Sequence, residues 1–258
     1  MDRPFCQRQV IWCLSKLNCT SLVIGAIHDM EIKIVSLIEG AQNAEGTVII
    51  IDVYRAFTTA SVAFARGVEK ILLTAEIDEA LTLRAEGAGE LCMGEVDGIR
   101  PKSFDFGNSP FELSLADVSG KTIIQSTRAG TVGVSAASKA TRIYGCSLVN
   151  AKATAKVVLA ELPKLVTIVA MGDKGLARTD EDEICALYLR NLLLGRSVDA
   201  DALRTLVLAG QDSDNFDNLE KPQYHPRDRD LALAIDSHSF AIAIHRKGGL
   251  LIAHPVNC

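Results

Sequence analysis

The chain has 258 residues, of which 48% are hydrophobic and 23% charged, so it can bury a sizeable core as one large α/β domain or two small ones. Its net charge of −5 argues against non-specific nucleic-acid binding, which needs a basic surface, but allows a local site for a small anion. The apolar stretch 22–27 is too short for a membrane span, and seven cysteines without a C-x-x-C pair predict reduced thiols in a cytoplasmic protein.

Residues 1–29 differ from the rest of the chain, because they carry the single tryptophan and three of the seven cysteines but no clear strand or helix pattern. Met30 then opens an alternating strand pattern. We therefore expect Met30 to be the natural start, residues 1–29 to be an unstructured or non-native extension, and residues 30–258 to form a single α/β domain.

From residue 30 to about residue 210, strand patterns alternate with helix patterns. The predicted strands are 32–37, 48–53, 70–74, 90–93, 122–126, 142–146 and 166–171. The predicted helices are 55–66, 77–86, 110–116, 131–139, 151–162, 180–194 and 200–208. This alternation predicts a three-layer α/β fold, with a mostly parallel sheet and helices on both faces.

The C-terminal part of the chain departs from this alternation. Residues 212–230 are polar, contain two prolines and are interpreted as a loop or linker, whereas residues 231–258 predict a short helix and one or two edge strands. The stretch 184–194 is apolar almost all round, which suits either a deep core or the interface of a homo-oligomer, and we expect the core.

The most informative stretch is 48–56, in which four apolar residues of a buried strand are followed by Asp52 and Arg55 and then by helical spacing. Ligands of open α/β folds bind outside the carboxyl ends of the strands. Asp52 and Arg55 are therefore candidates for a site, although a helix cap and a solvated arginine would show the same pattern.

Other polar groups follow other predicted strands in the same way, and the carboxyl ends of parallel strands lie along one edge of a sheet. We therefore expect these groups to converge. They are Glu95, Thr127, Arg128, Thr131, Asn150, Asp173, Glu181 and Asp182.

The chemistry of such an edge favours an anion and metal site. Carboxylates without clustered His or Cys suit Mg²⁺ rather than Zn²⁺, helix N-termini suit phosphate, and arginines hold oxyanions in a bidentate way. A structural alternative is that Glu181 and Asp182 only stabilise the N-terminus of a helix through its dipole. The D-x-D pair of haloacid-dehalogenase-type phosphatases is absent, because Tyr54 occupies the second position, and no P-loop or G-x-S-x-G nucleophile elbow is present.

These residues in this order resemble the 2-phosphosulfolactate phosphatase family of coenzyme M biosynthesis. The matching stretches are 51–59, 94–98, 104–110, 126–131, 147–151 and 172–183. The chain departs from the family's frequent Thr-Asn-Gly-Thr at residues 127–131, where Arg128 adds a positive charge. The resemblance implies an α/β phosphatase that uses Mg²⁺ to hydrolyse (2R)-2-phospho-3-sulfolactate to 3-sulfolactate and phosphate.

The resemblance and the expected convergence together give a set of candidate site residues. The catalytic candidates are Asp52, Arg55 and Glu95. The metal candidates are Asp52, Glu181 and Asp182. The substrate-binding candidates are Arg55, Asn108, Ser109, Thr127, Arg128, Thr131 and Asn150.

The sequence leaves open whether a carboxylate such as Asp52 acts as the nucleophile or as the base that activates water. It also leaves two other functions open. The first is hydrolysis of another small anionic phosphoester, and the second is non-catalytic binding of phosphorylated or sulfonated metabolites.

Overall fold

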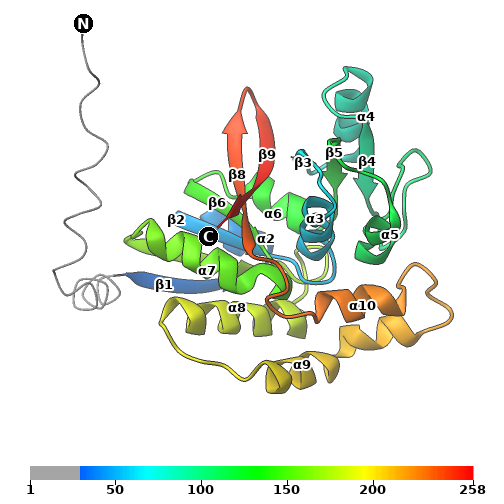
Figure 1. Ribbon diagram of the computed structural model, residues 1–258. Helices are drawn as coiled ribbons and strands as arrows, with labels where there is room; N and C mark the ends of the chain where they lie inside the picture. The colour runs from blue at the N-terminus through cyan, green and yellow to red at the C-terminus, as the bar shows by residue number, and fades with distance from the viewer. Residues whose placement is uncertain (1–29, 258) are drawn as a thin grey trace, which may run out of the picture.

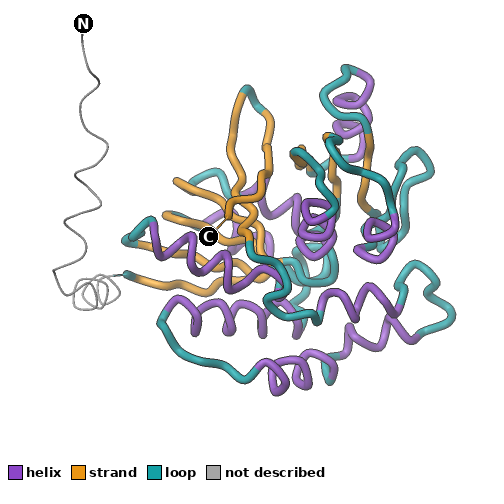
Figure 2. The backbone as a smooth tube through the Cα atoms, in the orientation of Figure 1, coloured by secondary structure: helices purple, strands orange, loops and turns teal. Residues whose placement is uncertain are grey.

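In the computed structural model, which describes residues 30–257, nine strands form one sheet in the order β1-β7-β2-β6-β8-β9-β3-β5-β4, with helices on both faces (Figure 2). Most strand pairs are parallel, which confirms the predicted three-layer α/β fold. The strands are β1 (Glu31–Ser36), β2 (Gly46–Ile51), β3 (Lys70–Thr74), β4 (Leu91–Gly94), β5 (Thr122–Ser126), β6 (Ala140–Cys146), β7 (Leu165–Ala170), β8 (Phe240–Lys247) and β9 (Leu250–Asn257).

The helices that the sequence predicted are present with boundaries close to those expected. They are α3 (Ala56–Ala65), α4 (Ile77–Ala85), α5 (Pro110–Leu115), α6 (Gly130–Ala136), α7 (Ala151–Ala160), α8 (Asp180–Leu193) and α9 (Ala200–Leu208). The structure adds α2 (Leu37–Asn43), α10 (Pro226–Ala232) and the 3-10 helices η1 (Leu148–Asn150) and η2 (Gln211–Asp217).

The sheet consists of two parallel groups that run in opposite directions. One group is β1, β7, β2 and β6, and the other is β3, β5 and β4. The hairpin of β8 and β9 lies between them and pairs antiparallel with β6 on one side and with β3 on the other. Figure 1 shows the first group running across the view and the second standing upright, so the sheet is sharply bent at the hairpin.

The helices α3 and α6 fill the inner side of this bend. One hydrophobic cluster joins Val48 and Ile50 of β2 to Phe57 of α3, Val134 of α6 and Ile71 of β3. The alternate residues of β2, Ile49 and Ile51, face the other way and pack with α7 and α8. The stretch 184–194 therefore contributes mainly to the core, as expected, although Leu187 is 52% exposed.

The polar groups do not meet at one edge of a flat parallel sheet, as the sequence predicted, but at a bend of the sheet. In a flat sheet, the carboxyl ends of the two groups would lie at opposite edges, since the groups run in opposite directions. They meet here because the sheet turns around α3 and α6.

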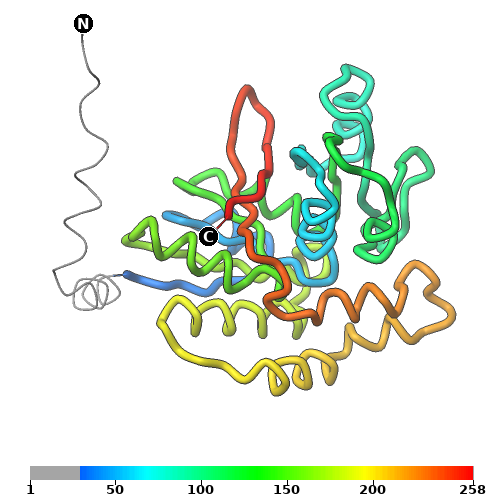
Figure 3. Tube along the Cα trace, in the orientation of Figure 1, coloured from blue at the N-terminus to red at the C-terminus, as the bar shows by residue number. Residues whose placement is uncertain are grey.

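The C-terminal region differs from the prediction in two respects. The hairpin β8–β9 occupies the middle of the sheet rather than an edge, with Ala241 and Ile242 fully buried. Residues 212–230 are not a linker, because α10 packs against α5, and η2 packs against α10 and α8; Figure 3 shows this segment in orange. The hydrophobic pattern of a short segment predicts neither its position in a sheet nor its contacts with distant segments of the chain.

Two sequence predictions concern the ends and the domain boundaries. The predicted extension, residues 1–29, lies outside the described residues, and the single domain over 30–258 stays a prediction. Across residues 30–257, each helix is too short or too polar to cross a lipid bilayer.

We predict that Ile242→Ala destabilises the fold strongly, because Ile242 is fully buried between β6 and β9 in the centre of the sheet. Loss of a buried Ile side chain costs about 2–5 kcal/mol, so the thermal midpoint should fall by roughly 4–20 °C. The exposed His245 on the same strand provides the control, since His245→Ala should cost less than about 0.5 kcal/mol. Equal shifts for the two variants in calorimetry would contradict the central position of the hairpin.

Candidate functional site

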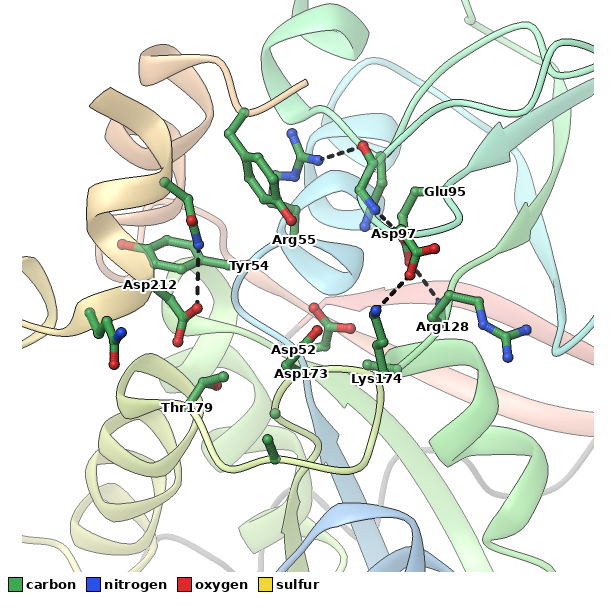
Figure 4. Close-up of a pocket in the computed structure, with 18 of the residues that line it drawn as sticks. Asp52, Tyr54, Arg55, Glu95, Asp97, Arg128, Asp173, Lys174, Thr179 and Asp212 are labelled. Carbon is green, nitrogen blue, oxygen red and sulfur yellow. Dashed lines mark hydrogen bonds and ion pairs between the residues drawn. The ribbon is translucent and has the colours of Figure 1, made fainter. Parts of the chain in front are cut away.

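A polar pocket of about 480 Å³ lies where the carboxyl ends of the two strand groups meet (Figure 4). Its walls come from the loops after β2, β4, β5 and β7, from the turn before α5 and from η2 with the segment that follows it. The carboxylates that line it are Asp52, Glu95, Asp97, Asp173 and Asp212, and the cations are Arg55, Arg128, Lys174, Arg178 and Lys221. This volume and polarity suit a small charged ligand.

Asp52 lies at the end of β2 with 4% of its surface exposed, and it connects the two strand groups. Its Oδ1 accepts a hydrogen bond from the Ala56 N–H at 2.8 Å, and its Oδ2 accepts one from the Gly130 N–H at 2.8 Å. Only glycine allows this approach, since a Cβ at position 130 would lie 2.9 Å from Asp52 Oδ2. Each oxygen keeps a further lone pair for a ligand, because a carboxylate offers about four acceptor sites.

Burial raises the pKa of Asp52 to about 6, and the charge of Glu95 also raises it. The N–H donors of Ala56 and Gly130 and the charge of Arg55 act in the opposite direction. With a pKa near 6, Asp52 gains or loses its proton close to neutral pH, and pKa values shifted in this way are common at functional sites.

Glu95, a predicted catalytic residue, lines the pocket but also holds two loops together. Its Oε2 accepts from the Gly98 N–H at 2.7 Å, and its Oε1 accepts from the Arg128 N–H at 2.8 Å. Glu95 therefore orients the loop after β4 relative to the loop after β5.

Asp182, a predicted metal ligand, is buried and does not line the pocket. Its Oδ1 accepts from the Val53 N–H at 2.7 Å, and its Oδ2 accepts from the Gly172 N–H at 2.8 Å. Burial, followed by the charges of Glu181 and Asp52, holds the pKa of Asp182 well above its usual range. We assign Asp182 to joining the loops after β2 and β7, and the metal role expected of it stays a prediction that these contacts do not favour.

Glu181, the other predicted metal ligand on α8, lines a recess beside the pocket together with Asp173 and Asp212. Burial, and to a smaller extent the charges of Asp212 and Asp52, raise the pKa of Glu181 to about 8. Burial and the charge of Asp173 raise the pKa of Asp212. The recess thus gathers carboxyl groups whose ionised forms a bound cation would stabilise.

Arg55 lines the pocket with 3% of its surface exposed, so it is not the solvated arginine of the alternative interpretation. Its Nη1 donates to the Asp228 carboxylate at 2.6 Å and to the Gln223 carbonyl at 2.7 Å, and its Nη2 lies 3.4 Å from the Gly98 carbonyl. The guanidinium carbon lies 4.8 Å from the centre of the Tyr224 ring.

The remaining cations lie on the rim and are more exposed. Arg128 has a side chain that is 42% exposed and a distant ion pair of 3.8 Å with Glu76. Lys174 pairs with Asp97 at 2.6 Å across the pocket mouth, which joins the loops after β7 and β4 (Figure 4). These rim cations are free to exchange their partners for a ligand anion, since exposed ion pairs are weak.

Only some of the predicted substrate-binding residues line the pocket. Asn108 lines it and is 5% exposed, and its Oδ1 has no partner within residues 30–257. Four others do not line the pocket; Thr127, Thr131 and Asn150 form local hydrogen bonds, and Ser109 also donates its hydroxyl to Asp228 at 2.6 Å. Ser109 caps α5, Thr127 and Thr131 bond to each other, and Asn150 accepts from the Ser147 N–H.

Several pocket residues were missed at the sequence level. Asp212, Lys221 and Tyr224 belong to the stretch interpreted as a linker, and Tyr54 was noted only as the replacement of an aspartate. The aromatic residues in this polar stretch were the available signal that it is folded, since solvated linkers contain few aromatic side chains.

Comparison with known families yields one match that covers most of the chain. A sequence model of the family described as 2-phosphosulpholactate phosphatase matches residues 32–227. This range includes every candidate residue named above, whereas Asp228, the partner of Arg55, lies just beyond it.

Individual relatives agree with this match. The chain is 41% identical over 131 residues to a probable 2-phosphosulfolactate phosphatase of Carboxydothermus hydrogenoformans, across 50% of this chain and 54% of the relative. It is 34% identical over 152 residues to one of Bacillus subtilis, across 58% and 65%. It is 35% identical over 135 residues to one of Thermus thermophilus, across 52% and 56%. The chain thus spans between about half and two thirds of the length of these relatives.

We predict that Asp182→Asn lowers stability, because the amide NH₂ would face one of the two backbone N–H donors that the carboxylate now accepts. A buried polar group left without a partner costs about 1–3 kcal/mol, so the thermal midpoint should fall by roughly 2–10 °C. Asp180→Asn is the matched control, since Asp180 is exposed in the same first turn of α8. A thermal midpoint for Asp182→Asn equal to that of the control would show that the two backbone bonds contribute nothing to stability.

Proposed function

The chain belongs to the 2-phosphosulpholactate phosphatase family, and from this membership we propose that it is a phosphoric monoester hydrolase. We propose (2R)-2-phospho-3-sulfolactate as its substrate, with 3-sulfolactate and phosphate as products, in the cytoplasm and within coenzyme M biosynthesis. The observation that carries the proposal is that a buried guanidinium, Arg55, and a buried carboxylate, Asp52, line the same polar pocket.

The distribution of cations supports a substrate with several negative charges. Phosphosulfolactate carries a phosphate, a carboxylate and a sulfonate. Arg55 lies deep in the pocket, whereas Arg128 and Lys174 lie on its rim. We assign the phosphate to Arg55, whose fork suits bidentate binding, and the sulfonate or carboxylate to the rim.

The donor chemistry of the site fits Mg²⁺, which we propose as the cofactor. The described residues that line the pocket and its recess include oxygen donors but neither His nor Cys. Between residues 30 and 257 no three side chains of His, Cys, Asp or Glu come close enough to hold a metal ion alone. Mg²⁺ typically needs only one or two carboxylates, because water and substrate phosphate complete its shell.

Asp52 and Glu181 are the two carboxylates that we propose to hold this ion, with Asp212 beside them. When bound, Mg²⁺ supplies positive charge that polarises a phosphoryl group. Arg55 binds the phosphoryl oxygens and stabilises the charge that develops on them. Asp52 supplies the carboxylate of the reaction, as the nucleophile or as the base that activates water.

We predict that Arg55→Lys lowers kcat/KM about 10- to 100-fold for every phosphoester, since a hydrogen bond to a charged group contributes about 1.5–3 kcal/mol. Arg128→Ala should lower kcat/KM for phosphosulfolactate and phospholactate but spare an aryl phosphate. Steady-state kinetics on these three substrates measures both effects. Arg100→Ala is the control, because Arg100 pairs with Glu112 and does not line the pocket.

Two outcomes of these kinetics would contradict the assignment. Equal losses on all three substrates for Arg128→Ala would show that Arg128 does not select the substrate. Equal turnover of phospholactate and phosphosulfolactate by the wild-type protein would show that the sulfonate is not recognised.

We predict that EDTA abolishes turnover and that Mg²⁺ restores it. Glu181→Gln and Asp52→Asn should each weaken Mg²⁺ binding at least about tenfold in calorimetry, since the isosteric amide removes the charge. Glu39→Gln is the control, because Glu39 is exposed on α2 and does not line the pocket or its recess. Full turnover in EDTA would remove Mg²⁺ from the proposal.

Phosphate release from a panel of phosphoesters, with and without Mg²⁺, separates the proposed enzyme from the two alternatives. Release from phosphosulfolactate above all others supports the proposed substrate, and preference for another ester identifies a related phosphatase. Binding without release from any ester would instead identify a non-catalytic binder.

A further inference from the structure

Asp228 on α10 is a fully buried carboxylate at the back of the site. It is the first residue after the range that the family match covers, and it belongs to the stretch that sequence analysis interpreted as a linker. It does not line the pocket, so it has no direct access to a ligand there.

The two oxygens of Asp228 bind groups from two other parts of the chain. Oδ2 accepts from Arg55 Nη1 at 2.6 Å. Oδ1 accepts from the Ser109 hydroxyl at 2.6 Å and from the Phe111 N–H at 2.9 Å. One carboxylate therefore holds both the buried guanidinium of the pocket and the turn that carries Asn108.

The neighbours of Arg55 restrict its guanidinium further. Both N–H groups of Nη1 are engaged, by Asp228 and by the Gln223 carbonyl, and Nη2 lies 3.4 Å from the Gly98 carbonyl. The Tyr224 ring lies against its face at 4.8 Å. A guanidinium has five N–H donors, so two remain without a partner in residues 30–257.

The charge of Asp228 orients the guanidinium of Arg55. The donor is charged in all three hydrogen bonds, but Gln223 and Gly98 offer neutral carbonyls, whereas Asp228 offers a carboxylate; only the bond to Asp228 therefore adds the attraction between two opposite charges in a buried place. With Nη1 turned toward α10, the unpaired donors of Arg55 are left for the pocket that Arg55 lines.

We propose that Asp228 is a positioning residue, which acts through Arg55 by fixing the guanidinium so that its free N–H donors face the phosphoryl group of the substrate. The inference rests on the proposed function for the identity of the ligand. The segment from η2 to α10 thereby supplies both a wall of the pocket, through Asp212, Lys221 and Tyr224, and the anchor of its buried cation.

The test is a double-variant cycle of Asp228→Asn and Arg55→Lys. Asn keeps an oxygen for Ser109 and Phe111 but turns an NH₂ toward the Arg55 donors, so it unpairs Arg55 selectively. Asp228→Asn alone should lower kcat/KM on phosphosulfolactate about 10- to 100-fold, as Arg55→Lys does. The double variant should lie within about threefold of Arg55→Lys, because residues that act as a unit are non-additive.

The same four proteins are titrated with inorganic phosphate by calorimetry, which requires no turnover. Asp228→Asn should weaken phosphate binding as much as Arg55→Lys does, with the same non-additivity. Asp230→Asn is the matched control, because Asp230 is exposed two residues further along α10 and should leave kinetics and binding unchanged. Circular dichroism verifies the fold of each variant.

The outcomes separate the two proposals. Losses that multiply in the double variant, or wild-type values for Asp228→Asn, would overturn the positioning role even if the protein is a phosphatase. Absence of hydrolysis by the wild-type protein would overturn the proposed function, whereas the phosphate titrations would still test Asp228. If Asp228→Asn fails to fold, Asp228→Glu replaces it, since it keeps the charge and should show a smaller, about fivefold loss with the same non-additivity.

Discussion

The pocket depends on carboxylates that each accept two backbone N–H groups from separate segments. Asp52 does this for the starts of α3 and α6, and Glu95 and Asp182 do it for loops after β2, β4, β5 and β7. A polar pocket offers little apolar surface to pack, so its walls need charge-assisted hydrogen bonds to hold one arrangement. The N–H groups at the starts of helices are suitable donors, because they have no partner within their own helix.

This way of holding the loops has an electrostatic consequence. The charge of Asp52 raises the pKa of both Glu181 and Asp182, and the charge of Glu181 raises the pKa of Asp182, in addition to the larger effect of burial. The structural anchors of the loops and the candidate ligands of a cation therefore share one region of negative charge. A divalent cation and an anionic substrate can enter such a region together, because each neutralises part of the charge that opposes the other.

The bent sheet brings these groups within reach of each other. The β8–β9 hairpin joins two parallel groups of opposite direction, and α3 and α6 pack inside the bend. Loops from both groups then surround one pocket, and η2 and α10 close its back. The pocket consequently has a rigid interior around Arg55, which is buried and paired, and a rim of exposed cations such as Arg128. Differences in substrate selection within one chemistry would be expected at the rim, where side chains are free to move.

The sequence by itself determined the alternation of strands and helices, since hydrophobic periodicity reports which residues face the core. It also placed Asp52, Arg55, Glu95 and Arg128 at the site, because ligands of α/β folds bind at the carboxyl ends of the strands, and the family resemblance added Asn108. Only the tertiary structure decided that Asp182 and Asn150 bind backbone groups rather than line the pocket, that the hairpin is central, and that Asp228 reaches Arg55 from 173 residues away. The physical reason is that periodicity records burial within one segment, whereas a hydrogen bond between distant segments leaves no local pattern in either of them.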